Sequence, residues 1–238
     1  MATQLGFDLP VRAALGREDF FVSPANAMAV ALLEGWQGWP GRKLLLIGPS
    51  GAGKTHLAHV WAGQSGARIL HSTDLARPDL PQAEIPTLAQ TPVVVEDIDQ
   101  IAGHKGAEKA LFHLHNLVIA EGHSLLLTSA CAPQHLGLSL PDLQSRVQGC
   151  QSASLGAPDD RLLGAVLMKL FADRQLVPTP DTLPYLVRWM TRSFDSARQI
   201  VAEMDAQALA QGRPLNRALA REVLARHVQP DMLDNPPT

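Results

Sequence analysis

Residues 48–55 of the chain read GPSGAGKT, and this stretch decides the fold class. It matches the pattern GxxxxGK[ST], in which a glycine-rich loop joins a strand to a helix and surrounds phosphate groups with backbone N–H donors. The apolar run Lys43–Ile47 precedes the loop and a helical stretch at 54–62 follows it, so both required neighbours are present. A glycine-rich turn that only carries a surface lysine would not need this context. The sequence therefore predicts a site for the phosphates of a nucleotide.

Each part of this phosphate loop has an expected role. The glycines let the backbone curl towards the phosphates, and the N-terminus of the following helix adds positive potential. Lys54 would reach the terminal phosphates, and the Thr55 hydroxyl would bind Mg²⁺. The predicted phosphate-binding residues are Gly48, Pro49, Ser50, Gly51, Ala52, Gly53, Lys54, Thr55 and His56.

Apolar runs alternate with helical stretches as far as residue 155. We predict strands at 43–47, 68–71, 92–95, 124–128 and 153–155, and helices at 23–35, 54–62 and 108–121. Such alternation is typical of an α/β fold in which a parallel sheet has helices on both faces. The first helix is expected to have Ser23 as its N-cap and Pro24 as its first residue.

The pattern changes after Gly156-Ala157-Pro158. Four helical stretches follow, at 159–174, 181–192, 195–211 and 215–227. Pro184 is expected in the first turn of its helix, where a missing N–H costs little. The predicted organisation is an arm at 1–10, an α/β nucleotide-binding subdomain at 11–157, an all-helical lid subdomain at 158–230 and a disordered tail at 231–238.

The composition excludes several classes of protein. The chain is 46% hydrophobic and 18% charged, and its net charge is −3. Domains that bind nucleic acid on their own usually have an excess of basic residues, so the charge argues against this class. No run approaches the roughly 18 apolar residues of a membrane span, and the N-terminus lacks a secretory signal. Two cysteines and nine histidines show no metal-binding spacing. We expect a cytoplasmic protein without a membrane partner.

Two acids follow the apolar run 93–95. Glu96 and Asp97 would lie at the carboxyl end of a parallel strand beside the phosphate loop, where acids can hold Mg²⁺ and orient the attacking water. Alternatively, Glu96, Asp97 and Asp99 form only an acidic cluster at a helix N-terminus.

Further segments resemble a known family. The phosphate loop continues as GKTHLAH, the fourth strand region reads LLLTSACAP at 125–133, PDLQSRV follows at 141–147, and RSFDSARQIVAEMD occupies 192–205. In this order and spacing they resemble the AAA+ module of the bacterial replication initiator DnaA and, more closely, its regulatory relatives of the Hda type. The resemblance covers about residues 16–228. It implies a P-loop AAA+ fold that binds ADP or ATP with Mg²⁺.

The resemblance also suggests roles for residues outside the loop. Phe21 and Val22 would lie near the adenine, and Arg146 would be an arginine finger that acts on a nucleotide held by a neighbouring molecule. Arg198 resembles the lid arginine, called sensor II, that contacts the phosphates. Read without the family, Arg146 is an arginine at a helix end and Arg198 is an ordinary exposed helical arginine.

The chain departs from the initiator's pattern at two positions. Glu96 stands where the initiator has an aspartate, and Ala130 stands where it has an acidic sensor residue. Both differences predict weak or partner-dependent ATP hydrolysis by this chain without loss of nucleotide binding.

The N-terminal arm reads QLGFDL at 4–9. It resembles the QLxLxL-type peptide by which regulators of this family bind the DNA polymerase sliding clamp, with Gln4, Leu5, Phe7 and Leu9 as the contact residues. Apolar anchors on a terminal arm suit such a pocket. The alternative is an arm that packs on its own domain.

The function implied by the resemblance is inactivation of the initiator. The chain would bind the beta subunit sliding clamp on DNA and present Arg146 to ATP bound by DnaA, which would make it an inhibitor of DNA replication. It would have no autonomous DNA-binding domain, because the sequence ends after the lid. The alternatives are a helicase loader or initiator-like remodeller, which would need its own ATP turnover, and a small P-loop kinase. A homo-oligomer stays open.

Overall fold

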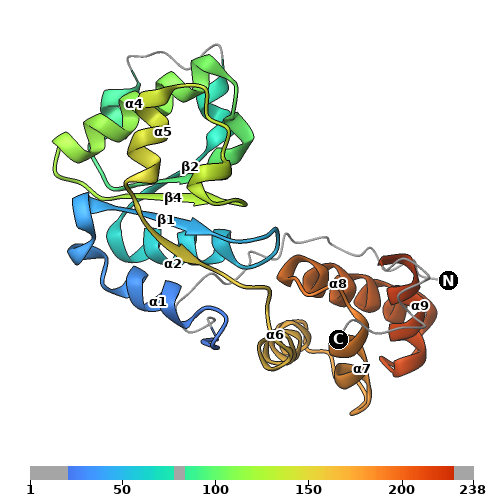
Figure 1. The fold of residues 1–238 in the computed structure, drawn as a ribbon. Coiled ribbons are helices and arrows are strands. Elements are labelled where there is room, and N and C mark those ends of the chain that lie inside the picture. Colours follow the sequence, from blue (N-terminus) through green and yellow to red (C-terminus); the bar gives the residue numbers. More distant parts are fainter. Residues whose placement is uncertain (1–20, 78–83, 228–238) are drawn as a thin grey trace.

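A computed structural model describes residues 21–77 and 84–227 (Figure 1). The described chain forms a parallel sheet flanked by helices, followed by a group of helices. No helix in these two ranges is both long and apolar enough to cross a membrane.

The sheet has five parallel strands in the order β2-β3-β4-β1-β5. Their bounds are β1 Lys43–Ile47, β2 Arg68–His71, β3 Val93–Glu96, β4 Leu125–Ser129 and β5 Gln151–Ser154. The register aligns Leu45 of β1 with Leu127 of β4 and with Ser152 of β5. Because β1 lies between β4 and β5, the phosphate loop that follows it emerges at the carboxyl edge between these two strands. This edge is where open parallel sheets bind ligands.

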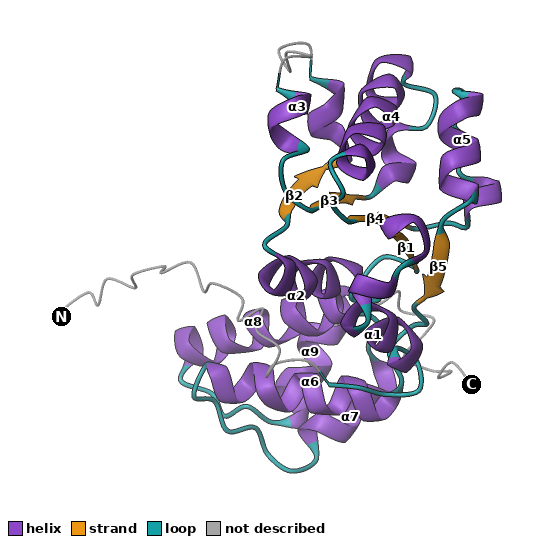
Figure 2. Ribbon diagram, turned by 90° about the vertical axis from the view of Figure 1, so that its left-hand side faces the viewer, coloured by secondary structure: helices purple, strands orange, loops and turns teal. Residues whose placement is uncertain are grey.

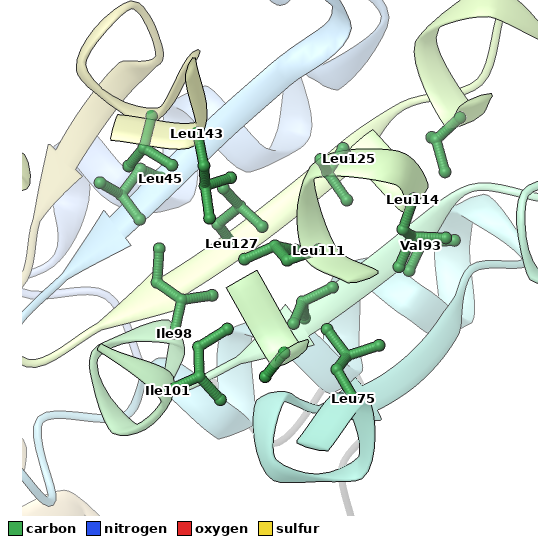
Figure 3. Close-up of a cluster of buried hydrophobic side chains, with 14 of the residues drawn as sticks. Leu45, Leu75, Val93, Ile98, Ile101, Leu111, Leu114, Leu125, Leu127 and Leu143 are labelled. Carbon is green, nitrogen blue, oxygen red and sulfur yellow. The ribbon is translucent and has the colours of Figure 1, made fainter. Parts of the chain in front are cut away.

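Alternating side chains of the strands feed two hydrophobic cores. Leu45 belongs to the core under α3 (Ile85–Leu88), α4 (Lys105–Ala120) and α5 (Pro141–Gln148), which Figure 3 shows in part. Leu44 and Leu46 point to the other face and pack against α1 (Ala27–Glu34) and α2 (Lys54–Ser65). Burying both faces accounts for the continuous apolar strands, since each fully buried leucine contributes about 1.5–3 kcal/mol. The predicted sheet with helices on both faces is confirmed.

The second part of the chain is all helical and has its own core; we call it the lid. Its helices are α6 Asp160–Asp173, α7 Thr182–Trp189, α8 Phe194–Gln211 and α9 Arg217–His227. Pro184 is the third residue of α7, in the first turn as predicted. Figures 1 and 2 place the lid on the side of the sheet that carries α1 and α2.

Two local features differ from the predicted helix bounds. The first helix begins at Ala27 and not at Pro24, although Ser23 caps the turn before it: its Oγ accepts from the Ala25 N–H at 3.2 Å and its carbonyl accepts from the Ala27 N–H at 2.9 Å. Asn26 folds back over this turn, where its Oδ1 accepts from the Ser23 N–H at 2.8 Å and its Nδ2 donates to the Phe21 carbonyl. The side chain thereby closes a turn that replaces the first helical turn. The bounds of α5 were not predicted, although Arg146 was expected at a helix end, because Pro141–Gln148 is short and polar and buries only Leu143 and Val147.

Candidate nucleotide-binding site

The phosphate loop is anchored at its first residue. Gly48 donates its N–H to the Ser129 carbonyl at 3.1 Å, while the preceding Ile47 carbonyl accepts from Leu155 at 2.7 Å. A Cβ on Gly48 would lie 2.8 Å from the Leu155 carbonyl oxygen, so the position has no room for a side chain. Ladder bonds to β4 and the end of β5 therefore set where the loop begins.

The lid touches the loop directly. The Phe194 N–H, at the start of α8, donates to the Gly51 carbonyl at 2.9 Å. Gly51 and Gly53 have φ values of +73° and +97°, which favour glycine. A Cβ on Gly51 would lie 2.4 Å from Ser193 Cβ, and one on Gly53 would lie 2.9 Å from the Phe194 ring. The glycines thus allow both the curled loop and the close approach of the lid.

Lys54 is a buried cation without a carboxylate partner in the described chain. The residue is 7% exposed, and its Nζ donates to the carbonyls of Gly48 and Pro49 at 2.9 and 3.3 Å. A buried ammonium is costly unless an anion balances it. Thr55, next along α2, is exposed, while His56 is half-buried. An anion held by the loop would provide the missing charge.

Glu96 ends β3 as a buried carboxylate. The residue is 8% exposed, and its Oε1 has no hydrogen-bond partner among the described residues. Burying an unpartnered carboxylate oxygen is unfavourable, and hard cations such as Mg²⁺ prefer such oxygen ligands. β3 is next but one to β1 in the sheet, with only β4 between them. Glu96 therefore fits a magnesium ligand, and the exposed Thr55 hydroxyl fits a second.

Asp97 is held in an uncommon backbone conformation. Its φ is +53°, and its N–H donates to Thr128 Oγ1 at 2.9 Å while its carbonyl accepts from Ser72 Oγ at 2.7 Å. Its carboxylate lies 3.5 Å from Nε2 of His71. The hydrogen bonds to Thr128 and Ser72 hold the Asp97 backbone in this uncommon conformation.

Three of these supporting residues were not predicted from the sequence. Thr128, Ser72 and His71 lie 31, 25 and 26 positions from Asp97, so no local pattern linked them to it. Asp99 adds a further contact, because its Oδ1 accepts the Ala130 N–H at 2.9 Å. A carboxylate is thus present beside position 130 although the residue there is alanine. The clue in the sequence was polar residues at the ends of neighbouring strands.

Arg198, Phe21 and Val22 have distinct surroundings. Arg198 lies one turn beyond Phe194 on α8 and pairs with Asp195 at 2.5 Å. Phe21 is 39% exposed and Val22 62% exposed. Val22 lines a cavity of about 120 Å³ between α1 and α2. Arg198 thus lies one helical turn after the residue that contacts the loop. Its contact with phosphate, and that of Phe21 and Val22 with adenine, stay predictions.

Arg146 lies at the opposite end of β1 from the phosphate loop. It is exposed near the end of α5, and its carbonyl accepts from Lys43 Nζ at 2.9 Å; Lys43 is the first residue of β1, whereas Gly48 follows the last. The strand alone separates these ends by about 15 Å, at roughly 3.3 Å per residue. Within the described chain, no carboxylate pairs with its guanidinium. The structure therefore places Arg146 away from the chain's own phosphate loop.

Glu108 joins α4 to the start of α5. It has no exposed surface, and its Oε1 accepts from the N–H groups of Gly103 and Ser139 at 2.7 and 3.0 Å. Its Oε2 accepts from Ser139 Oγ at 2.8 Å and the Leu140 N–H at 2.7 Å. Burial opposes ionisation, but these hydrogen bonds outweigh it and hold the Glu108 pKa below its usual value. One carboxylate thus sets the position of the helix that carries Arg146.

We expect Glu108→Ala to lower the free energy of unfolding by about 3 kcal/mol or more, because three backbone N–H groups lose their acceptor. Glu108→Gln should lose less. Because the folded-state pKa is lowered, the wild-type advantage over Glu108→Gln is present above the ordinary glutamate pKa of 4.5 and is lost as pH falls through the lower folded value. Urea unfolding at neutral and acid pH measures both effects. Glu121→Gln, on the exposed residue that follows the last turn of α4, is the control. A pH-independent difference would contradict the prediction.

The predicted clamp-binding residues Gln4, Leu5, Phe7 and Leu9 lie outside the described residues, as do the whole predicted arm at 1–10 and the whole predicted tail at 231–238.

The fold and the loop together define a P-loop module with the AAA+ type of fold. Its marks are the sheet order β2-β3-β4-β1-β5, the loop after β1, two acids at the carboxyl end of β3 and a helical lid against the loop. Domain III of the replication initiator DnaA from Thermotoga maritima has a similar structure, with a TM-score of 0.80 and 21% identity over 93% of this chain and all of that one. A DnaA structure described as bound to AMPPCP and single-stranded DNA has a TM-score of 0.70 and 18% identity, covering 86% of this chain and 66% of that one.

Sequence comparison points to the same relatives. The chain is 26% identical to the chromosomal replication initiator protein DnaA of Thermus thermophilus over 92% of its length. It spans about half the length of the curated relatives it matches, 55% in this case. No protein-family model matches the chain. The chain is therefore similar to DnaA-type AAA+ replication proteins, and its fold is that of their domain III.

Proposed function

We propose that the chain is a negative regulator of replication initiation that stimulates hydrolysis of ATP bound by the initiator DnaA. Nucleotide, ADP or ATP with Mg²⁺, occupies its own phosphate loop and stabilises the contact between loop and lid. The sliding clamp recruits it through residues 4–9. The reaction takes place in the partner's site, to which this chain contributes Arg146.

One observation carries this proposal: Arg146 is an exposed arginine without a carboxylate partner in the described chain, at the opposite end of β1 from the chain's own phosphate loop. An exposed guanidinium far from its own nucleotide suits a role on another molecule's nucleotide. The backbone around it is well held, since Lys43 bonds its carbonyl and Glu108 fixes the start of α5. Such preorganisation reduces the cost of binding charge in a transition state.

The residues of this chain would contribute by position and charge. The planar Arg146 fork would donate to oxygens of the partner's γ-phosphate as negative charge grows during bond cleavage. Mg²⁺, when bound, neutralises phosphate charge. In the chain's own site Lys54 would hold the phosphates, and Glu96 and Thr55 would hold the ion. Asp97 contacts His71, which competes with any role in orienting water. We expect the chain's own turnover to be weak.

The test is the rate at which initiator-bound ATP is hydrolysed, with and without this chain, in the presence of clamp and DNA. Acceleration that requires the chain supports the proposal. An unchanged rate contradicts it.

Replacing both Leu5 and Phe7 with alanine should weaken clamp binding by about 100-fold, because two apolar anchors are lost at about 1.5 kcal/mol or more each. Nucleotide affinity should stay unchanged, since the loop belongs to the folded module. Titration of surface-bound clamp with the variant measures the effect. Asp8→Ala, within the same segment, is the matched control. Equal binding by wild type and the double variant would exclude this peptide as the anchor.

An initiator-like remodeller is the second candidate. It is favoured by the similarity to DnaA and by the complete set of loop lysine, threonine and strand-end acids, which would serve a chain with its own turnover. Steady-state ATP hydrolysis by the chain alone separates the two: rapid turnover favours the remodeller.

A further inference from the structure

An open groove runs between α6 and α7 on the surface of the lid. Its volume is about 660 Å³, within the roughly 300–1,000 Å³ that is typical of ligand sites. Its apolar lining comes from Gly164 and Met168 of α6 and from Leu183, Pro184 and Val187 of α7. Met168 is 63% exposed, so a large apolar side chain faces solvent here. This surface suits apolar side chains of an occupant, and we call it the α6–α7 groove.

Gly164 keeps the groove open. It is the fifth residue of the fourteen-residue helix α6, in the helix interior, where glycine is less favourable than alanine. A Cβ at this position would lie 3.9 Å from Val187 Cγ2, which is an ordinary contact distance. A side chain would therefore fit and would fill space between the two helices. The sequence thus gives up helix stability at the position whose side chain would narrow the groove.

The groove carries charge at one end and on its rim. Asp160, the first residue of α6, pairs at 2.6 Å with Arg192, which lies three residues after α7. This pair joins the start of one helix to the end of the other, so the two helices run antiparallel along the groove. Arg188 also lines the groove; it is exposed and has no carboxylate partner in the described part of the chain. A segment with apolar side chains and one acid therefore suits the groove.

The N-terminal arm joins the described chain next to this groove. The Ala25 carbonyl accepts the Gly156 N–H at 3.2 Å, and Gly156 precedes the first residue of α6 by four positions. Figures 1 and 2 both show α1, which begins two residues after Ala25, near α6. The eleven residues 10–20 can span about 35 Å at roughly 3.3 Å each, whereas the α6 side of the groove, 160–168, is about 12 Å long. The arm is therefore long enough to reach the whole groove.

We propose that the α6–α7 groove binds residues 4–9 of the chain's own arm, and that this contact competes with binding of the same residues to the sliding clamp. The competition rests on the proposed clamp binding, whereas the docking does not. In an extended segment Leu5, Phe7 and Leu9 lie on one face, so all three can meet the apolar lining. The Asp8 carboxylate then lies on the other face, towards Arg188 at the rim. An exposed ion pair contributes little, so the apolar anchors carry the contact.

The C-terminal segment is a poorer occupant. Residues 229–238 contain the apolar neighbours Met232 and Leu233 together with three prolines. Adjacent residues point to opposite faces of an extended segment, so only one of these two side chains can enter the groove. The arm offers three anchors on one face.

The expected strength of the competition follows from the tether. A tethered segment acts at an effective concentration on the order of 1 mM. A peptide that binds the groove with a Kd of about 0.1 mM would thus occupy it about 90% of the time when tethered. Only the released fraction can bind clamp, so the affinity for clamp would be lowered about tenfold.

The first measurement needs no clamp. A labelled peptide of residues 1–12 is titrated by fluorescence anisotropy onto the full-length wild type and onto full-length Leu5→Ala/Phe7→Ala, whose own arm has lost its anchors. The double variant should bind the peptide about tenfold more tightly than wild type, because its groove is vacant. Adding Gly164→Leu to the double variant should abolish peptide binding. Adding Gly63→Leu should not, because Gly63 is an exposed glycine of α2 with open space around its Cβ.

The second measurement uses surface-bound clamp. Gly164→Leu in the otherwise wild-type chain should bind clamp about tenfold more tightly than wild type, because the arm is released. Gly63→Leu should bind clamp as the wild type does. A gain in affinity does not arise from misfolding. All variants should also bind fluorescent ADP like wild type, since none of the substitutions lies in the phosphate loop.

Several results would overturn the proposal. Equal peptide binding by wild type and by the double variant, or peptide binding that survives Gly164→Leu, would exclude the groove as the site of the arm. Tighter binding of a peptide of residues 229–238 would assign the groove to that segment, and a dimer that Leu5→Ala/Phe7→Ala dissolves would place the arm on a second copy. Unchanged clamp affinity of Gly164→Leu would exclude the competition. If no form bound clamp, the proposed recruitment would fail, and the peptide titration would still decide the docking.

Discussion

Lys54→Ala should weaken the binding of fluorescent ADP by about 100-fold. The loss of about 3 kcal/mol corresponds to two charge-assisted hydrogen bonds to phosphate, at roughly 1.5 kcal/mol each. Lys54 is buried at the start of α2, and its ammonium group donates to loop carbonyls. It is the only lysine among residues 48–55. The measurement is a fluorescence titration with Mg²⁺ present.

The control is Lys109→Ala, which removes an exposed lysine on α4 outside the site. Both variants should retain the wild-type thermal transition, because the Lys54 ammonium is unfavourably buried without an anion. If Lys54→Ala bound ADP with undiminished affinity, the loop would not be the phosphate site. If Lys54→Ala lost both the thermal transition and ADP binding, the variant would be misfolded. The same two measurements would then be made on Lys54→Met.

Arg146→Ala should abolish stimulation of the initiator's ATPase, a loss of about 10³-fold or more in the stimulated rate. The residue is predicted to act on charge that grows in the transition state, so the effect should appear in the rate of the chemical step and not in the affinity for DnaA. Arg146→Lys should restore little, because a point charge cannot bridge two phosphate oxygens as a planar fork can. Single-turnover hydrolysis of initiator-bound ATP, with clamp and DNA, measures the effect.

Arg68→Ala is the matched control for this variant. Arg68 is an exposed arginine at the start of β2, on the same edge of the sheet as Lys43, so its removal changes the charge of that edge equally. Neither variant should change ADP affinity or clamp binding. Full stimulation by Arg146→Ala would eliminate the arginine-finger role and favour the initiator-like alternative.

Local patterns were enough to predict the sheet, the phosphate loop and the helical lid. A buried parallel strand is a continuous apolar run, and the loop is eight consecutive residues whose chemistry depends on their own backbone. The strands Lys43–Ile47 and Arg68–His71 therefore have the predicted bounds. β5, Gln151–Ser154, was predicted late and short, because its polar residues are held at the sheet edge by backbone bonds to β1 and not by an apolar pattern.

The sequence by itself determined the phosphate loop and the helical stretches, because the spacing and periodicity that predict them lie in consecutive residues. Only the tertiary structure decided which distant groups meet. Phe194 reaches Gly51 across more than a hundred residues, Glu108 binds the backbone before α5, and Thr128 holds Asp97. These contacts are hydrogen bonds formed once packing places the elements, and any polar side chain of suitable length could supply them. Their partners therefore leave no pattern along the chain, and the position of Arg146 follows from the packed helices alone.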